Sequence, residues 1–145
     1  MSFNSLLQTF STQFPYGDFQ LMPDEIINNI VERENVPDEY GVYLIYGVKN
    51  NQKELIYIGK SGTLKQDGTF KEQKLRKRLT MKQNGIYRKE FFRKLMRENN
   101  YHSLYFKWFI TYSSKMKELP AYVEATLLNE FFKENHKLPK LNKTF

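Results

Sequence analysis

The sequence contains no cysteine and only two histidines, His102 and His136, among its 145 residues. The lack of cysteine excludes disulfide scaffolds, zinc sites with thiolate ligands and thiol catalysis. With two histidines, neither a histidine-rich metal site nor a histidine-based triad is expected. No apolar run approaches the roughly 18 residues that span a bilayer, and the N-terminal residues lack the basic start and small-residue cleavage site of a signal peptide. We therefore expect a cytoplasmic protein that does not bind membranes.

The length is that of one folded domain, at roughly 100–200 residues per domain. A chain of this size buries about two-thirds of its unfolded surface, so it forms a hydrophobic core without disulfides or metals. We predict two parts within it. Residues 1–36 form a helical extension packed on the core, and residues 37–145 form the main domain.

Charge is distributed unevenly along this chain, whose formal net charge is +7. Residues 1–40 carry one basic residue against seven acidic ones, whereas residues 71–97 carry eleven basic residues against two acidic ones. A concentrated basic face is typical of a protein that binds a polyanion, most often nucleic acid. A solvated pair of basic helices is the alternative, but aromatic residues interleaved with the charges favour contact with phosphates. We expect the acidic segment to be turned away from the basic surface.

Hydrophobic periodicity predicts an α+β fold in which helices flank a small, mostly antiparallel sheet of three strands, with a helical extension at the N-terminus. Helices are predicted over residues 3–14, 23–36, 71–82, 87–98 and 120–135. Strands are predicted over residues 41–48, 54–59 and 103–112, with the first two joined as a hairpin. Residues 60–70 are predicted to form a loop. Because both faces of the hairpin strands are apolar, we expect the sheet to be covered on both sides.

Glu124 is the residue whose position points most directly to chemistry. At about 100° per residue, it falls near the middle of the apolar face of the helix predicted over residues 120–135. A glutamate is almost never fully buried unless it is paired or bound to a metal ion. Two interpretations stay open: a buried ion pair with an arginine or lysine, or a carboxylate in a cleft that holds a hard divalent cation.

The helix predicted over residues 71–82 carries Lys74, Arg78 and Lys82 at intervals of four, so these three side chains share one face. Leu75 and Leu79 anchor the adjacent stripe. The planar guanidinium of arginine suits a phosphate better than the ammonium of lysine does. The spacing therefore predicts an arginine facing phosphate beside the hairpin, although such faces are usually only solvated.

Five segments, in this order, resemble the signature of the GIY-YIG nuclease superfamily. They are Gly41-Val42-Tyr43, Tyr57-Ile58-Gly59-Lys60, Leu75-Arg76-Lys77-Arg78-Leu79, the helical Glu124, and Pro139-Lys140-Leu141-Asn142. The resemblance spans roughly residues 41–142. It implies a GIY-YIG-like fold and an endonuclease that hydrolyses phosphodiester bonds in DNA with one divalent metal ion, Mg²⁺ or Mn²⁺.

The resemblance also implies a role for each matched residue. Glu124 would hold the metal ion, which polarises the scissile phosphate, and Arg78 would neutralise the transition state, with Arg76 as the competing arginine. Tyr43 would receive or relay the proton of the attacking water, and Tyr57 would position the phosphate or water. An unperturbed tyrosine has a pKa of about 10, so a tyrosine base needs positive charge nearby, for which Lys60 is the candidate. Asn142 would support the site by hydrogen bonding. Without the resemblance, both tyrosines would be interpreted as ordinary sheet packing.

Basic residues around these positions are predicted to contact the nucleic acid: Lys74, Arg76, Lys77, Lys82, Arg88, Lys89 and Arg93. DNA is the predicted partner and RNA an alternative substrate, and targeting by a homodimer or by a partner protein stays open. The chain departs from the superfamily pattern in four places. The spacer between the first two segments is slightly longer than in compact members, and the stretch between Ser61 and Gln73 is clearly longer. Lys82 stands where many members have histidine or tyrosine, and the interval between Glu124 and Asn142 is long. The second hypothesis is therefore a nucleic-acid-binding module that keeps the fold without turnover.

Overall fold

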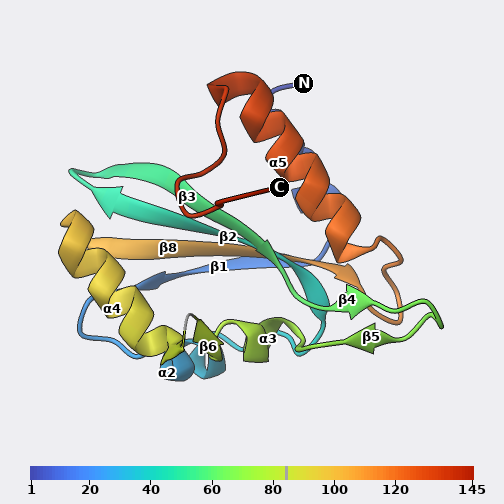
Figure 1. Cartoon of the computed structure of the whole chain (residues 1–145), viewed down its shortest axis with the longest axis horizontal. Coiled ribbons are helices and arrows are strands. Elements are labelled where there is room, and N and C mark those ends of the chain that lie inside the picture. Colours follow the sequence, from blue (N-terminus) through green and yellow to red (C-terminus); the bar gives the residue numbers. More distant parts are fainter. Residues whose placement is uncertain (84) are drawn as a thin grey trace.

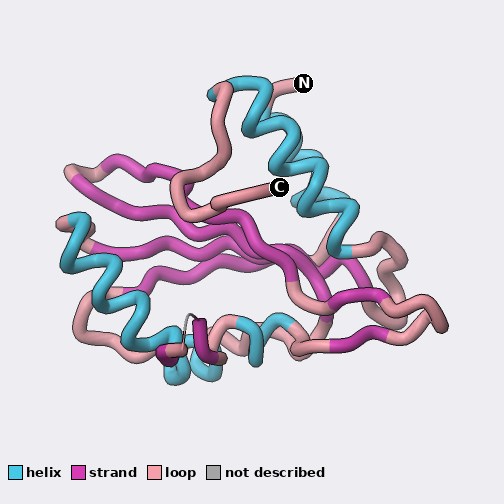
Figure 2. The backbone as a smooth tube through the Cα atoms, in the orientation of Figure 1, coloured by secondary structure: helices cyan, strands magenta, loops and turns pink. Residues whose placement is uncertain are grey.

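The structure, a computed structural model, describes residues 1–83 and 85–145 and is shown in Figures 1 and 2. A twisted antiparallel sheet lies at its centre, with helices above and below it (Figure 1). The main elements are α1 (Phe3–Gln13), β1 (Tyr16–Leu21), α2 (Ile27–Arg33), β2 (Tyr40–Lys49), β3 (Gln52–Lys60), α3 (Leu75–Arg78), α4 (Arg88–Asn99), β8 (Ser103–Tyr112) and α5 (Pro120–Asn135). None of the described helices is long and apolar enough to cross a bilayer.

The central sheet has four strands in the order β1-β8-β2-β3, and all neighbouring pairs are antiparallel. The β2–β3 hairpin turns at Asn50 and Asn51, which both have the positive φ angles that a tight two-residue turn requires. Four short strands form two separate ribbons: β4 (Thr63–Leu64) with β5 (Phe70–Lys71), and β6 (Lys82–Gln83) with β7 (Ile86–Tyr87).

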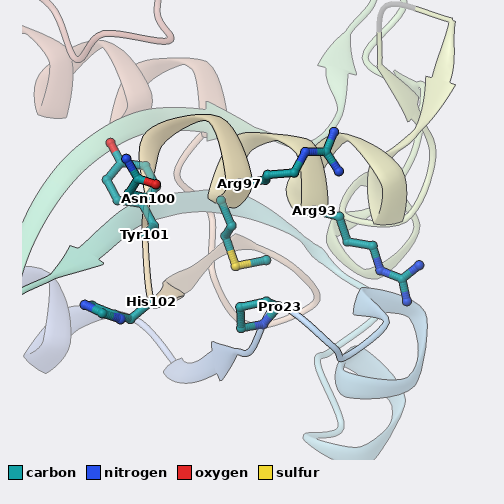
Figure 3. Close-up of a pocket in the computed structure, with 7 residues that line it drawn as sticks. Pro23, Arg93, Arg97, Asn100, Tyr101 and His102 are labelled. Carbon is teal, nitrogen blue, oxygen red and sulfur yellow. The ribbon is translucent and has the colours of Figure 1, made fainter.

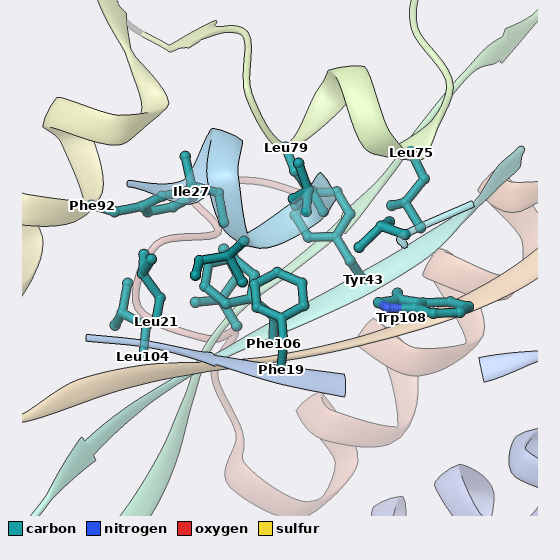
Figure 4. Packing of buried hydrophobic residues seen from close by; sticks show 14 of the residues in the cluster. Phe19, Leu21, Ile27, Tyr43, Leu75, Leu79, Phe92, Leu104, Phe106 and Trp108 are labelled. Carbon is teal, nitrogen blue, oxygen red and sulfur yellow. The ribbon is translucent and has the colours of Figure 1, made fainter. Parts of the chain in front are cut away.

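Both faces of the sheet are covered, as we predicted from its apolar strands. One face packs against α2, α3 and α4. Figure 4 shows Leu75 and Leu79, at the two ends of α3, near the ring of Tyr43 on β2, and Phe92 of α4 next to Ile27 of α2. The other face packs against α1 and α5. The backbone N–H of Phe3 donates to the carboxylate of Glu134 at 2.6 Å, which ties the start of α1 to the end of α5. The two N-terminal helices therefore lie on opposite faces of the sheet.

Several elements agree with the sequence predictions. The predicted helices over residues 3–14, 87–98 and 120–135 correspond to α1, α4 and α5, and the strand over 103–112 is β8. The hairpin is present and slightly longer at both ends than predicted. The loop predicted over residues 60–70 contains the β4–β5 ribbon, whose Phe70 stacks on Tyr40 at 4.3 Å between ring centroids.

The prediction of three strands and a purely helical extension is incomplete, because residues 16–21 form β1. This strand pairs with β8 along its whole length and makes the sheet four-stranded. Only Phe19 and Leu21 of its six residues are buried, so its sequence carries little of the apolar signal of a strand. The N-terminal 36 residues thus contribute to the main sheet, and the division of the chain at residue 37 stays a prediction.

Two predicted helices are shorter than expected. α2 begins at Ile27 because residues 22–25 form a turn in which the Met22 N–H donates to the Glu25 carboxylate. α3 is one turn long, since Leu75 and Leu79 are its buried anchors and the chain then enters the β6–β7 ribbon. Lys74, Arg78 and Lys82 therefore do not share a helix face, and that prediction was wrong.

The expectation that the acidic segment is turned away from the basic one was also wrong. α2 packs on the same face of the sheet as α3 and α4. Arg76 of α3 donates to the carbonyl of Val36 at 2.6 Å and to the side chain of Asn35 at 3.2 Å. The end of the acidic segment is thus held directly against the start of the basic one.

Candidate active site

Two phenols lie together on one face of the β2–β3 hairpin. Tyr43 is directly opposite Gly59, and Tyr57 is opposite Ile45, so the two tyrosines are diagonal neighbours on the same face. Their ring centroids are 5.8 Å apart with the planes inclined at 45°. Tyr43 is completely buried and Tyr57 is half-buried. We call Tyr43 and Tyr57 the phenol pair.

Gly59 leaves the space that the phenol pair occupies. A Cβ atom at this position would lie 2.7 Å from Cζ and 2.8 Å from the hydroxyl oxygen of Tyr43, and 2.6 Å from a ring carbon of Tyr57. Contacts below 3.0 Å are essentially never seen for real Cβ atoms. A glycine opposite Tyr43 is therefore required for both rings to sit where they do.

Two arginines approach the phenol pair from neighbouring elements. Arg88, the first residue of α4, is 2% exposed, and its Nη1 donates to the hydroxyl oxygen of Tyr43 at 3.2 Å. Arg78 ends α3, is half-buried, and donates to the sulfur of Met81 at 3.6 Å. The Nε atoms of both arginines are buried and have no hydrogen-bond partner within the part of the chain that the structure describes. Two guanidinium groups thus bring positive charge to the phenols.

Glu124 of α5 lines one cavity with Tyr57, although α5 packs on the sheet face opposite the one that contains Tyr43. Lys60 is the last residue of β3. Lys60 donates to the carbonyl of Gly62 and to the hydroxyl of Thr63, both at 3.1 Å. Glu124 is half-buried, with the buried Leu127 and Leu128 one turn further along α5, on the side of the helix that packs on the sheet. Among residues 1–83 and 85–145 it forms no ion pair within 4 Å, so the ion-pair interpretation of its burial finds no support there.

The pKa shifts show that these groups share one electrostatic environment. Burial raises the pKa of Glu124 above its ordinary value, and the positive charges of Lys60 and Arg78 oppose that rise. Burial lowers the pKa of Arg78, but the nearby Tyr43, Tyr57 and Glu72 together hold it above its ordinary value. Electrostatic influence thus links five groups from four different elements: Tyr43 on β2, Tyr57 and Lys60 on β3, Arg78 on α3 and Glu124 on α5.

Tyr57 differs from Tyr43 in what it can do. Burial raises the pKa of Tyr57 to about 12, with Tyr43 and Glu124 adding to the rise and Arg88 and Arg78 opposing it. Tyr57 therefore keeps its proton at neutral pH, and its hydroxyl can donate a hydrogen bond. The hydroxyl oxygen of Tyr43 instead accepts a hydrogen bond from the guanidinium of Arg88 at 3.2 Å.

Asn142 joins the residues after α5 to the exposed edge of β3. Its side-chain oxygen accepts from the N–H of Ile58 at 2.9 Å and its side-chain nitrogen donates to the carbonyl of Ile58 at 2.8 Å. The N–H of Leu141 donates to the carbonyl of Ile56. These three bonds hold the C-terminal residues along β3 next to Tyr57, where Figure 2 shows the loop crossing the sheet edge. Tyr57, Glu124 and Asn142 line a cavity of about 340 Å³ here.

Replacing Asn142 by alanine is expected to destabilise this edge, because the N–H and C=O of Ile58 both lose their partner. Two hydrogen bonds that contribute about 1 kcal/mol each give an expected loss of about 2 kcal/mol in the free energy of unfolding, measured by urea denaturation. Hydrogen exchange of the Ile58 amide is expected to accelerate. Asn135→Ala, which removes a side-chain bond to Phe131 on the surface of α5, is the control and should change neither quantity by as much. Equal losses in both variants would contradict this account of Asn142.

The residues predicted to contact nucleic acid are divided among different surfaces. Arg88 is buried at the phenol pair and does not lie on the surface, unlike our prediction. Lys77, Lys82 and Arg93 are exposed, whereas Lys74, Arg76 and Lys89 are half-buried. The ammonium groups of Lys82 and Lys89 lie 5.1 and 5.8 Å from the ring centroid of Tyr87, which is half exposed.

Arg93 lies beside a groove that contains none of the groups described so far. The groove has a volume of about 580 Å³ and lies between α4 and the segment that joins β1 to α2, with Pro23, Arg97 and His102 among its lining residues (Figure 3). On a helix, Arg93 and Arg88 differ by about 140° in direction. Arg93 therefore belongs to a different surface from the phenol pair.

The carboxylate of Glu124 fits a metal ion that is held mainly by other ligands. In the described residues no three carboxylate, histidine or cysteine side chains cluster in a way that would enclose a metal. Mg²⁺ is commonly bound through one or two carboxylates together with water and substrate phosphates. One half-buried carboxylate beside a cavity meets that minimal requirement, and Glu124 is the residue that would hold the ion.

Comparison of the chain with protein-family models, with curated proteins and with solved structures finds no match. The functional interpretation therefore depends on the residues and the geometry described above.

Proposed function

We propose that this chain is a metal-dependent endonuclease of the GIY-YIG type that hydrolyses phosphodiester bonds in DNA. The proposal is supported most by the pairing of two phenols on β2 and β3 and by the cavity that Tyr57 shares with the carboxylate of Glu124. The charges of Arg78 and Lys60 act on these groups, as their pKa shifts indicate. Phosphodiester hydrolysis requires groups that neutralise a developing negative charge, take up the proton of water and hold a cation. The groups at this site supply each of these.

Each side chain has a role that follows from its surroundings. Arg78, which is half-buried and whose Nε has no hydrogen-bond partner among the described residues, binds the scissile phosphate and offsets the charge that develops on it. Tyr57, which keeps its proton, donates to a phosphate oxygen or to the attacking water. Tyr43 takes up the proton of that water. Lys60 adds positive charge next to Glu124.

Glu124 would hold a divalent ion, whose Lewis acidity would polarise the phosphate and stabilise the leaving oxygen. Asn142 acts on β3 only and keeps Tyr57 in place. The exposed Lys77 and Lys82 contact the DNA backbone outside the site.

The test is the conversion of supercoiled plasmid to nicked or linear DNA in the presence of Mg²⁺ or Mn²⁺, with a structured RNA as a parallel substrate. The wild-type protein is expected to nick DNA, and Tyr43→Phe is expected to slow nicking by about 100-fold or more, which is the usual contribution of a general base. Tyr46→Phe is the matched control, because Tyr46 lies on the same strand and packs on the opposite face. DNA affinity of both variants should equal that of the wild type.

The competing function is a binding module without turnover. It is favoured by Lys82, which lies in β6 against Tyr87, at the position where many members of the superfamily have histidine or tyrosine. Pure wild-type protein that binds DNA, with affinity falling by orders of magnitude between low and moderate salt, but cuts neither DNA nor RNA with any metal ion, would establish the binding module and overturn the nuclease.

A further inference from the structure

Arg88 is a buried charged residue to which the proposed reaction assigns no role. It is 2% exposed and lies at the first position of α4, and its single hydrogen bond to a described residue through the side chain is the one from Nη1 to the Tyr43 hydroxyl oxygen. No carboxylate in residues 1–83 and 85–145 forms an ion pair with it. Its Nε is buried and has no partner in that part of the chain.

Protein stability does not explain a charge in this position. Burying a guanidinium without a carboxylate carries a desolvation penalty of several kcal/mol. The N-terminal end of a helix adds to the penalty, because the partial charge there is positive and repels a cation. Phe92, Leu95 and Met96 continue the same face of α4 into the core, so an apolar residue at position 88 would fit the surroundings better.

The direction of the hydrogen bond shows what Arg88 does for its neighbour. A guanidinium has only donors, so the hydroxyl oxygen of Tyr43 must be the acceptor. The oxygen is thereby held in one orientation, and the O–H of Tyr43 is left free to point elsewhere. The charge of Arg88 also extends to Tyr57, whose pKa it lowers against the effect of burial.

We propose that Arg88 is a positioning residue that holds the hydroxyl oxygen of Tyr43 in one orientation and supplies the positive charge that Tyr43 needs when it takes part in proton transfer. This inference rests on the proposed function. The inference adds a second arginine, from α4, to the proposed site. This arginine acts on the reaction through Tyr43 and does not touch the substrate.

Kinetics of plasmid nicking test this role. Arg88→Met is expected to lower kcat by about 100-fold and to leave KM unchanged, because the buried side chain makes no contact with DNA. Arg88→Lys, which keeps the charge, is expected to recover part of that loss. Arg97→Met, on the exposed side of the same helix, is the control and should behave as wild type.

In a Tyr43→Phe background, Arg88→Met should cause no further loss of kcat, because its effect depends on the Tyr43 hydroxyl, which Phe lacks. Equal losses in both backgrounds, or a rise in KM alone, would overturn the proposal.

Thermal unfolding gives a readout that does not need activity. Arg88→Met is expected to raise the melting temperature more in the Tyr43→Phe background than in the wild-type background, because only there has the guanidinium lost its acceptor. If Arg88→Met shifts the melting temperature equally in both backgrounds, Arg88 and Tyr43 are not coupled, and the positioning contact is overturned even if the enzyme is active. If this coupling is present and the wild-type protein cuts no nucleic acid, the contact stands and the proposed function fails, so the two failures are distinguishable.

Discussion

Glu124→Gln is expected to abolish metal-dependent nicking and to make the protein more stable at neutral pH. A metal ion that acts as a Lewis acid contributes several kcal/mol to transition-state stabilisation, and each 1.4 kcal/mol corresponds to about tenfold in rate. Loss of the carboxylate that holds the ion is therefore expected to slow nicking by about 1,000-fold or more. Product formation at saturating Mg²⁺, and titration of the rate with Mn²⁺, measure the loss.

The gain in stability follows from the direction in which the pKa of Glu124 is shifted. Burial raises this pKa in the folded protein, so unfolding allows the carboxyl group to ionise more easily. The stabilising contribution of its protonated form is fully present below the unfolded pKa, about 4.3, and is lost as the pH rises through the higher folded pKa. At neutral pH the ionised carboxylate of Glu124 therefore lowers the free energy of unfolding, whereas an uncharged glutamine does not.

The pH dependence separates this explanation from a general effect of the substitution. The melting temperatures of the wild type and Glu124→Gln should approach each other below about pH 4 and move apart as the pH rises. Glu130→Gln on the same helix is the control, because Glu130 is paired with Lys133 at 3.2 Å and does not line the cavity that contains Glu124. It should lose a little stability and no activity. If Glu124→Gln nicks DNA at the wild-type rate, Glu124 does not hold a catalytic metal ion, and that part of the proposal is wrong.

The sequence predicted the elements whose patterns are long and regular. The helices at residues 3–14 and 120–135 and the strand at 103–112 have apolar residues at the correct period over ten or more positions. β1 was missed because it is a short edge strand that buries only two side chains. We predicted a long helix from the charged run after Glu72. In the structure only Leu75 and Leu79 of this run are buried, so a longer helix has no apolar face to pack. Gly85, further on, adopts a positive φ that suits a turn.

The meeting of the phenol pair depends on a feature that the sequence does not reveal. Counted from the two-residue turn at Asn50 and Asn51, regular pairing would place Tyr43 opposite Ile58 and Tyr57 on the other face of the sheet. The register shifts by one residue between Ile45 and Tyr46, with Ile56 as the extra residue in β3. Ile56 and Tyr57 consequently both pack on the face that contains Tyr43. This bulge brings the two tyrosines together.

Arg88 was assigned to the surface because its neighbours in the sequence are basic. The helical period offered a different signal, since Arg88 precedes Phe92 by four residues and Leu95 by seven, which places it on the buried stripe of α4. For Glu124 the same kind of signal was recognised, because a single acidic residue interrupts an apolar face. An arginine at the first position of a charged helix is less conspicuous, and only the contact with Tyr43 reveals its environment.

Gly59→Ala is expected to damage both activity and stability, since the added methyl group would overlap both rings of the phenol pair. Inserting one carbon into a well-packed core typically costs about 1–3 kcal/mol, which urea denaturation would measure. The backbone cannot relieve the overlap easily, because Asn142 holds the N–H and C=O of Ile58 next to it. The rings must therefore move, and a displacement of about 1 Å at a reacting group can slow a reaction by about 100-fold.

Gly68→Ala separates the two effects. Gly68 has nothing within 4 Å of the position where a Cβ would lie, and its positive φ alone makes alanine unfavourable there. This control is expected to lose some stability and to keep full nicking activity, whereas Gly59→Ala loses activity at temperatures where it is fully folded. Because Tyr43 and Tyr57 meet only through the bulge at Ile56 and the space at Gly59, a Gly59→Ala protein with wild-type nicking would show that the spacing of these two phenols does not govern the reaction.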